Sequence, residues 1–451
     1  MPTTDTPPAI DPAAPRPTRF RWTIVGLFGA YELINYLDRI NLSVAGPIFA
    51  DHLRISPTAL GIAFSAFLWS YALMQIPSGI LLDRIGVRWI CRILIPIWAL
   101  ASLLTAVANG LGLVIISRLV LGVSEAPAFP SAMKATANWF PRVERGMATA
   151  MFSAPSRLSN VIGAPLVGLA VGVWGWRGAF IATGILSLVF AVVFWLTYRE
   201  PADARRTGRL SPEEYDYITD GGAHSDATRG AVVTPALLWY LLRQRKVVGL
   251  SLGLACAGYM SWMLLTWLPG FFQKELGTSV AKSGVYTAVP WAFAFVLEMT
   301  VAGWLVDALI KRGLRETTVR RGVLIGGMLL ACTVGLMGVS HSLLWSLTWI
   351  TVGTVGIAIS FSVSNSIPAL IAPPGAAATV GSIMNFVNAM AGIAAPIVTG
   401  VLLQKTGTFT IAFLVAAVIL VIGVVLYTVV LGAIEPVPAP VAGDPAAKVI
   451  E

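Results

Sequence analysis

The chain has 451 residues, of which 56% are hydrophobic and 12% are charged. Soluble proteins carry about 25% charged residues, so this composition argues against several soluble domains and for one polytopic membrane bundle. The net charge of +9 is typical of basic loops at one membrane surface and does not require a nucleic-acid partner. The three cysteines have no paired spacing, which supports neither a disulfide framework nor a metal site.

Apolar segments recur along the chain at the length of membrane-spanning helices. A spanning helix needs about 20 mostly apolar residues. Twelve segments qualify: 22–48, 58–82, 90–108, 111–134, 146–173, 178–197, 247–271, 283–310, 322–340, 343–366, 379–403 and 409–432. Within the polar stretch that separates the first six from the last six, SPEEYDYI predicts a short surface helix with Pro212 in its first turn.

The order of these segments predicts an all-α membrane protein with two pseudo-symmetric six-helix bundles. We expect five parts in chain order: a disordered tail (1–20), a six-helix bundle (21–198), a central loop (199–246), a second six-helix bundle (247–433) and a second disordered tail (434–451). Basic residues concentrate in alternate loops, which places both termini and the central loop on the cytoplasmic side.

The two halves also share a short motif. GILLDRIGVR (79–88) follows the second span, and GWLVDALIKRG (303–313) follows the eighth, which is the second span of the other half. Both contain Gly-x-x-x-Asp followed by basic residues. Internal repeats of this kind are typical of transporters that work by alternating access.

Four ionisable residues lie inside apolar segments: Asp38 and Arg39 in the first span, and Arg118 and Glu125 in the fourth. A charge at bilayer depth costs at least ~2.5–3.5 kcal/mol, so these residues indicate a functional pathway, the alternative being a structural ion pair. Arg118 and Glu125 are seven residues apart and share one helix face about 10 Å apart, so their partners must come from another helix or from substrate. We therefore predict the pairs Asp38/Arg118 and Arg39/Glu125.

Five stretches in order resemble one known family. They are NYLDRINLS, FLWSYALMQIPSG, GILLDRIGVR, RLVLGVSEAPAFPS and NWFPRVERG. Together with the 6+6 layout they resemble the major facilitator superfamily, and within it the anion:cation symporter branch that includes bacterial D-galactonate, hexonate and hexarate:proton symporters. The resemblance covers nearly the whole chain between the tails.

The resemblance implies roles for particular residues. It implies that Asp38 and Glu125 are protonation sites and that Arg39 contacts substrate. Arg118 is a further candidate for holding the anion because of its charge within an apolar span. It implies that the repeated motif holds one side of the transporter closed. We therefore assign to gating Gly79, Asp83, Arg84, Arg88, Asp307 and Arg312.

Neutral polar residues in the spans are candidates for substrate contacts, although such residues also serve as packing contacts between membrane helices. Tyr71 and Gln75 are one helical turn apart in the second span, and Trp262 lies within the seventh, where substrate can stack on it. The remaining candidates are Ser156, Ser362, Ser364, Asn365 and Asn385. The resemblance implies substrate-lining positions for Tyr71, Ser362, Ser364 and Asn385.

Three further charges lie within spans: Glu32, Arg157 and Glu298. Arg157 can supply a second cation for a dianion such as a hexarate or an aromatic dicarboxylate. Alternatively, it can pair with Glu32 or another acid as a structural bridge.

These features predict a proton-coupled symporter, and not an enzyme, that imports an organic carboxylate by alternating access. A sugar acid (hexonate, hexarate or hexuronate) is the first candidate; an aromatic or dicarboxylic acid, and export of an organic anion, are the alternatives. Protons are the expected coupling ion, and no other cofactor, metal or nucleic acid is expected. We expect a monomer in the bacterial inner membrane.

Overall fold

The first six spans form one group of helices. The computed structural model describes residues 19–141, 143–223, 235–339, 342–373 and 376–438, so the expected disordered tails fall largely outside it. The first group consists of α1 (Phe20–Leu53), α2 (Pro57–Ile85), α3 (Val87–Ala106), α4 (Leu111–Glu125), α5 (Ala128–Trp139) and α6 (Arg145–Thr197). α6 holds two spans, because Gly175 interrupts it with a non-helical backbone (φ 72°, ψ 173°).

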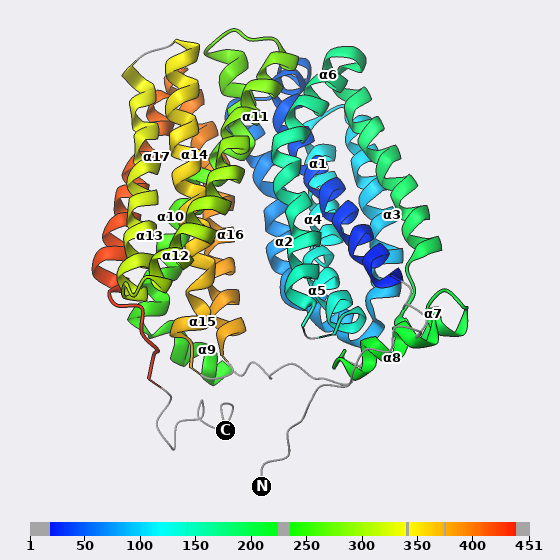
Figure 1. Cartoon of the computed structure of the whole chain (residues 1–451). Helices are drawn as coiled ribbons and strands as arrows, with labels where there is room; N and C mark the ends of the chain where they lie inside the picture. Colours follow the sequence, from blue (N-terminus) through cyan, green and yellow to red (C-terminus); the bar gives the residue numbers. More distant parts are fainter. Residues whose placement is uncertain (1–18, 142, 224–234, 340–341, 374–375, 439–451) are drawn as a thin grey trace.

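The last six spans form a second group beside the first (Figure 1). It consists of α10 (Arg245–Lys274), α11 (Val280–Leu297), η1 (Glu298–Leu305), α12 (Val306–Lys311), α13 (Glu316–Ala331), η2 (Cys332–Val339), α14 (Leu343–Ser366), α15 (Pro368–Ile371), α16 (Ala377–Thr406), α17 (Thr410–Val425) and η3 (Leu426–Leu431). The regular elements of the described residues are all helical.

The helices agree with the twelve expected spans. Ten helices in the described part of the chain are long and apolar enough to cross a membrane. α1, with 34 residues, is long enough to be a further span, and Gly175 divides α6 into two, so that twelve spans result. The protein is therefore a multi-pass integral membrane protein.

Three short helices follow the first group and precede the second in the sequence. They lie at one end of the molecule, which we call the α8 side (Figure 1). They are α7 (Pro201–Arg206), α8 (Pro212–Asp220) and α9 (Pro235–Leu242). The predicted surface helix at Pro212 is confirmed as α8, whose first turn is capped by the Ser211 hydroxyl. Buried Glu214 fixes α8 to α1, because its carboxylate accepts a hydrogen bond from Arg21 at 2.9 Å.

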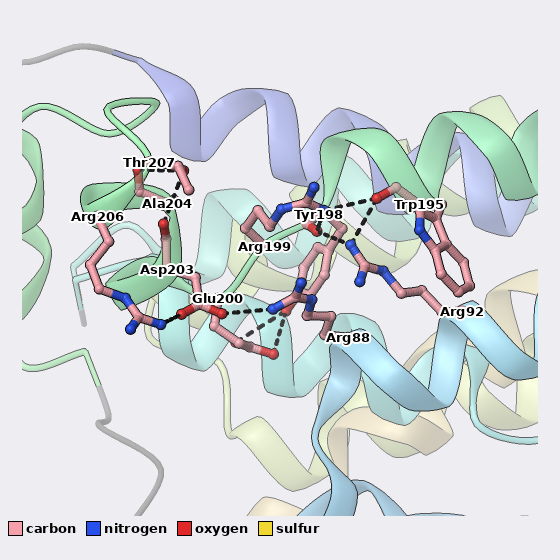
Figure 2. Close-up of polar contacts among 10 residues, drawn as sticks. All are labelled: Arg88, Arg92, Trp195, Tyr198, Arg199, Glu200, Asp203, Ala204, Arg206 and Thr207. Atoms are coloured by element: carbon pink, nitrogen blue, oxygen red, sulfur yellow. Dashed lines mark hydrogen bonds and ion pairs between the residues drawn. The ribbon is translucent and has the colours of Figure 1, made fainter.

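Arginines hold the α8-side end of α6 and the start of the central loop (Figure 2). Arg92 and Arg199 both donate to the Trp195 carbonyl at 2.8 Å, which satisfies an acceptor left open at a helix C-terminus. Arg88 donates to Asp203 of α7 at 2.8 Å. Hydrogen bonds from Arg206 and from Arg88 hold the pKa of Asp203 below its usual range, so this tie persists at neutral pH.

The two groups touch most closely on the side opposite α8. A Cβ on Gly61 of α2 would lie 2.3 Å from the Pro396 carbonyl of α16, and one on Gly284 of α11 would lie 2.4 Å from the Ala164 carbonyl of α6. Toward the α8 side the ribbons of α2 and α16 separate (Figure 1), and Leu73 and Phe386 are exposed. The two groups are thus in main-chain contact at one side, which we call the packed side, and their ribbons lie apart at the other, which we call the open side.

These close contacts predict that Gly61→Val impairs transport. The added side chain meets a main-chain carbonyl, which cannot move aside as a flexible side chain would. The conformation in which α2 and α16 touch should therefore lose about 1–3 kcal/mol of stability, which lowers its population roughly 5- to 150-fold. Uptake rates in proteoliposomes should fall accordingly. Gly112→Val is the matched control, because a Cβ there meets nothing within 4 Å. Equal losses in both variants would contradict a role for the α2–α16 contact.

Candidate functional site

Arg39 and Glu125 form a buried ion pair inside the first group. Arg39 Nε donates to Glu125 Oε2 at 3.0 Å, and Glu125 is fully buried. Glu125 is the last residue of α4, and Pro127 two residues later cannot donate the backbone hydrogen bond that would continue the helix. The predicted Arg39/Glu125 pair is therefore confirmed.

Three aromatic rings surround the same guanidinium. The Arg39 Cζ atom lies 4.7 Å from the centroid of Tyr36, 4.8 Å from Phe67 and 5.1 Å from Tyr71. Cation–π contacts of this kind reach about 2 kcal/mol when they are removed from water. Tyr71 was expected near the site. Tyr36 and Phe67 were missed, although Tyr36 lies one turn before Arg39 and Phe67 one turn before Tyr71.

The predicted side-chain pair Asp38/Arg118 is wrong. The Asp38 carboxylate instead accepts hydrogen bonds from Trp98 Nε1, from the Ser102 hydroxyl at 2.9 Å and from the Ser187 hydroxyl at 3.2 Å. Arg118 reaches only the Asp38 main-chain carbonyl, at 3.5 Å. The reason is helical geometry: adjacent residues point about 100° apart, so Asp38 faces α3 and α6 while Arg39 faces α4.

Arg118 is a buried cation that takes part in no ion pair among the described residues. The residue is 3% exposed and its Nε has no hydrogen-bond partner. The charges of Asp38 and Glu125 act on it from beyond ion-pair distance. The guanidinium lies over the Phe180 ring, 5.5 Å from its centroid. Because a buried unpaired charge is costly, this arrangement favours an anion as the missing partner.

Arg39 and Arg118 line a common cavity between the two groups of helices. The first group contributes these arginines and three apolar side chains, and α10 contributes the rest. Its lining consists of Arg39, Leu42, Phe64, Phe67, Arg118, Trp262, Leu265 and Thr266. Trp262, predicted to stack on substrate, therefore lines the same cavity as the two arginines. Two cations, one partner acid and aromatic walls make this cavity suited to a small organic anion.

Arg157 joins the two groups. Its Nη1 lies 2.9 Å from Glu298 Oε1 at the start of η1, so of the two alternatives for Arg157 the structure contains the bridge. The Ser362 hydroxyl of α14 also interacts with Glu298. Glu32, the other suggested partner, is buried without a hydrogen bond to its Oε1 atom.

The other predicted lining residues are dispersed. Ser364 is fully buried and hydrogen-bonded to Tyr427 at 2.9 Å, which places it in the packing of the second group and not at the cavity. Ser156 donates at 2.7 Å to the Ser153 carbonyl of its own helix. The side chains of three further residues, Gln75, Asn365 and Asn385, make no hydrogen bond within the described part of the chain. Gln75 is half-buried and the two asparagines are exposed.

Comparison with known proteins supplies the family. The profile of the Major Facilitator Superfamily matches residues 30–396. The chain belongs to the major facilitator superfamily. An uncharacterized transporter of Bacillus subtilis, YybO, is 40% identical over 423 residues, covering 93% of this chain and 96% of that protein. A D-galactonate transporter of Escherichia coli is 30% identical over 427 residues, covering 94% and 98%.

A solved structure supports the superfamily fold. A bacterial homologue of the human lysosomal transporter Spinster, in an inward-facing and occupied conformation, matches with a TM-score of 0.73. It is 17% identical and the match covers 91% of this chain and 96% of that one. The expected all-α superfamily architecture is thereby confirmed, and the chain is a transporter and not an enzyme.

In this superfamily member the residues assigned to gating lie on the α8 side, and the ion pairs of those whose side chains the structure describes stay within the first group and its adjoining loop. Asp83 pairs with Lys134 of α5 at 3.0 Å, and Arg88 pairs with Asp203 as described. The remaining assigned residues are placed as follows: Gly79 has open space at its Cβ position, Arg84 and Arg312 are exposed, and Asp307 lies on α12 with a side chain outside the described residues.

Proposed function

We propose that the protein is a secondary transporter that imports an organic carboxylate, with a sugar acid as the first candidate substrate. The observation that carries this proposal is the buried Arg118 guanidinium, which lines the cavity between the two groups and takes part in no ion pair among the described residues. Arg39 supplies a second cation, and Trp262 offers an apolar face to the carbon chain. The similarity to the D-galactonate transporter supports a sugar acid in particular.

The Arg39–Glu125 pair gives the proposal a coupling mechanism. While Glu125 is ionised it occupies Arg39. A proton on Glu125 weakens that pair and frees Arg39 for the substrate carboxylate, so the anion and the proton move together. Asp38 is the second proposed proton site, although its three neutral donors distinguish it from Glu125. Protons are the only cofactor in this proposal.

The proposal includes an orientation. The positive-inside rule supports a cytoplasmic α8 side, with the packed side facing outward and the open side facing inward. The bacterial inner membrane is the proposed location and a monomer the proposed unit. Residues 21–198 and 247–433 are the two bodies that rock about the cavity, linked by the loop 199–246 and flanked by tails over 1–20 and 434–451.

The test is accumulation in proteoliposomes that contain the purified protein. D-galactonate is the first probe, followed by a hexarate, a hexuronate and an aromatic acid. We expect an inward proton gradient, and not an outward one, to concentrate at least one of these acids inside. Accumulation only with the opposite gradient would identify an exporter, and binding of none of the acids would contradict the carboxylate substrate.

A further inference from the structure

The ion pair between Arg157 and Glu298 is exceptional in its position. Among the described residues it is the one ion pair that joins the two groups of helices; every other pair lies within one group or its adjoining loop. The Arg157 side chain is 52% exposed, whereas the Glu298 side chain is 11% exposed. The arginine therefore remains accessible while it is paired.

The packing of α6 on α1 fixes the depth of Arg157. Ser159 donates to the Leu33 carbonyl at 3.0 Å, and a Cβ on Gly163 would lie 3.0 Å from the Leu37 side chain. Arg157 is therefore level with about residue 31 of α1. Arg39 lies eight residues further along, which is about 12 Å at 1.5 Å per residue. Arg157 is consequently on the α8 side of the cavity, between the cavity and the open side.

Glu298 occupies an unusual backbone position. It begins η1, an eight-residue π-helical stretch within the span that α11 opens. π-helical turns inside α-helices are rare and occur frequently at functional sites. The Ser362 hydroxyl interacts with the same carboxylate, so an arginine, an acid and a hydroxyl from three spans meet at one point.

We propose that Arg157 is a specificity-determining residue that binds the second acid group of a dianionic substrate. Arg39 and Arg157 each form an ion pair with one glutamate in this structure. A glutamate side chain presents the same carboxylate group as an organic-acid substrate. Glu298 thus holds the position that the distal carboxylate of a diacid takes. The depth difference between the two arginines allows their long side chains to bracket an extended diacid such as a hexarate.

Replacement of Glu298 by a substrate carboxylate at Arg157 affects the contact between the two groups of helices. A dianion that displaces Glu298 from Arg157 also breaks the ion pair that joins them. A monoanion bound at Arg39 leaves that pair intact. This inference rests on the proposed function and deepens it by naming the substrate class as dianionic.

The test compares a hexarate with the hexonate of the same carbon chain, which lacks one terminal carboxylate. Affinities for both are measured by calorimetry on the purified full-length protein. We expect the wild type to prefer the hexarate. Arg157→Gln should lower the ratio of hexarate to hexonate affinity by about tenfold or more, since it removes a charged hydrogen-bond partner of one ligand only. Arg157→Lys, which keeps the charge but loses the planar fork, should lie between the two.

Arg320→Gln is the matched control, because Arg320 also pairs with a glutamate, Glu316, at 2.8 Å but lies within the second group. Its affinity ratio should equal that of the wild type. If Arg157→Gln does not fold, Glu298→Gln provides the second test. Because this variant lacks the carboxylate that competes for Arg157, the ratio of hexarate to hexonate affinity should rise.

The outcomes separate the two proposals. Equal changes in both affinities with Arg157→Gln, or a fall or no change in the ratio with Glu298→Gln, would overturn the second acid site. A wild type that binds the hexonate but not the hexarate would also overturn it and leave the proposed function intact. A wild type that binds no carboxylate would overturn the proposed function itself.

Discussion

Arg39→Ala should reduce substrate uptake by about 30-fold or more. Truncating one partner of a buried, hydrogen-bonded charge pair costs about 2–5 kcal/mol, and each 1.4 kcal/mol is tenfold in affinity. The substitution removes the proposed anion ligand and also leaves Glu125 buried opposite three aromatic rings. Initial uptake rates in proteoliposomes and binding by calorimetry both measure the loss.

Two variants separate binding from stability. Arg39→Ala alone should lower the unfolding temperature in detergent, because an uncompensated buried charge costs about 3–5 kcal/mol. The double variant Arg39→Ala/Glu125→Gln should recover much of that stability, since it removes the unpaired charge, but should not recover binding. Recovery of binding in the double variant would show that Arg39 acts on folding and not on the substrate.

Glu125→Gln should abolish proton-driven accumulation while substrate exchange continues. The amide keeps the size of the side chain but cannot exchange a proton, so the link between the proton gradient and the anion gradient is lost. With the membrane potential clamped, the ratio of inside to outside substrate should fall to about one. Counterflow, in which labelled substrate exchanges against unlabelled, should persist because Arg39 and Arg118 remain.

Glu316→Gln is the control for this prediction, because Glu316 is also paired with an arginine but lies at the start of α13, away from the cavity. It should accumulate substrate like the wild type. Gradient-driven accumulation by Glu125→Gln would exclude Glu125 as the coupling site and direct attention to Asp38.

The architecture could be anticipated because it depends on local properties of the chain. The length of apolar runs determines how many helices can cross the bilayer, and Pro212 after Ser211 is enough to start α8. The Arg39–Glu125 pair could also be anticipated, because a charge within an apolar span favours an opposite charge from another span. The same reasoning failed for Asp38, whose carboxylate is satisfied by neutral donors.

The partners of Asp38 and Arg157 could not be anticipated in the same way. Trp98, Ser102 and Ser187 are ordinary residues of apolar spans, and only the rotation of α3 and α6 about their axes turns them toward Asp38. The pairing of Arg157 with Glu298 depends on how the two groups of helices sit against each other. The local sequence pattern determines neither the rotation of a helix about its axis nor the relative placement of the two groups.

The position of the Gly61–Pro396 contact has a mechanical consequence. Because it lies near one end of α2, the rest of that helix is a lever arm: Gly61 and Ile85 are 24 residues apart, or about 36 Å. A rotation of about 10° at the contact would displace the far end by about 6 Å over that length. A small rotation at the Gly61–Pro396 contact thus produces a much larger displacement at the far end of α2, which opens or closes the other side.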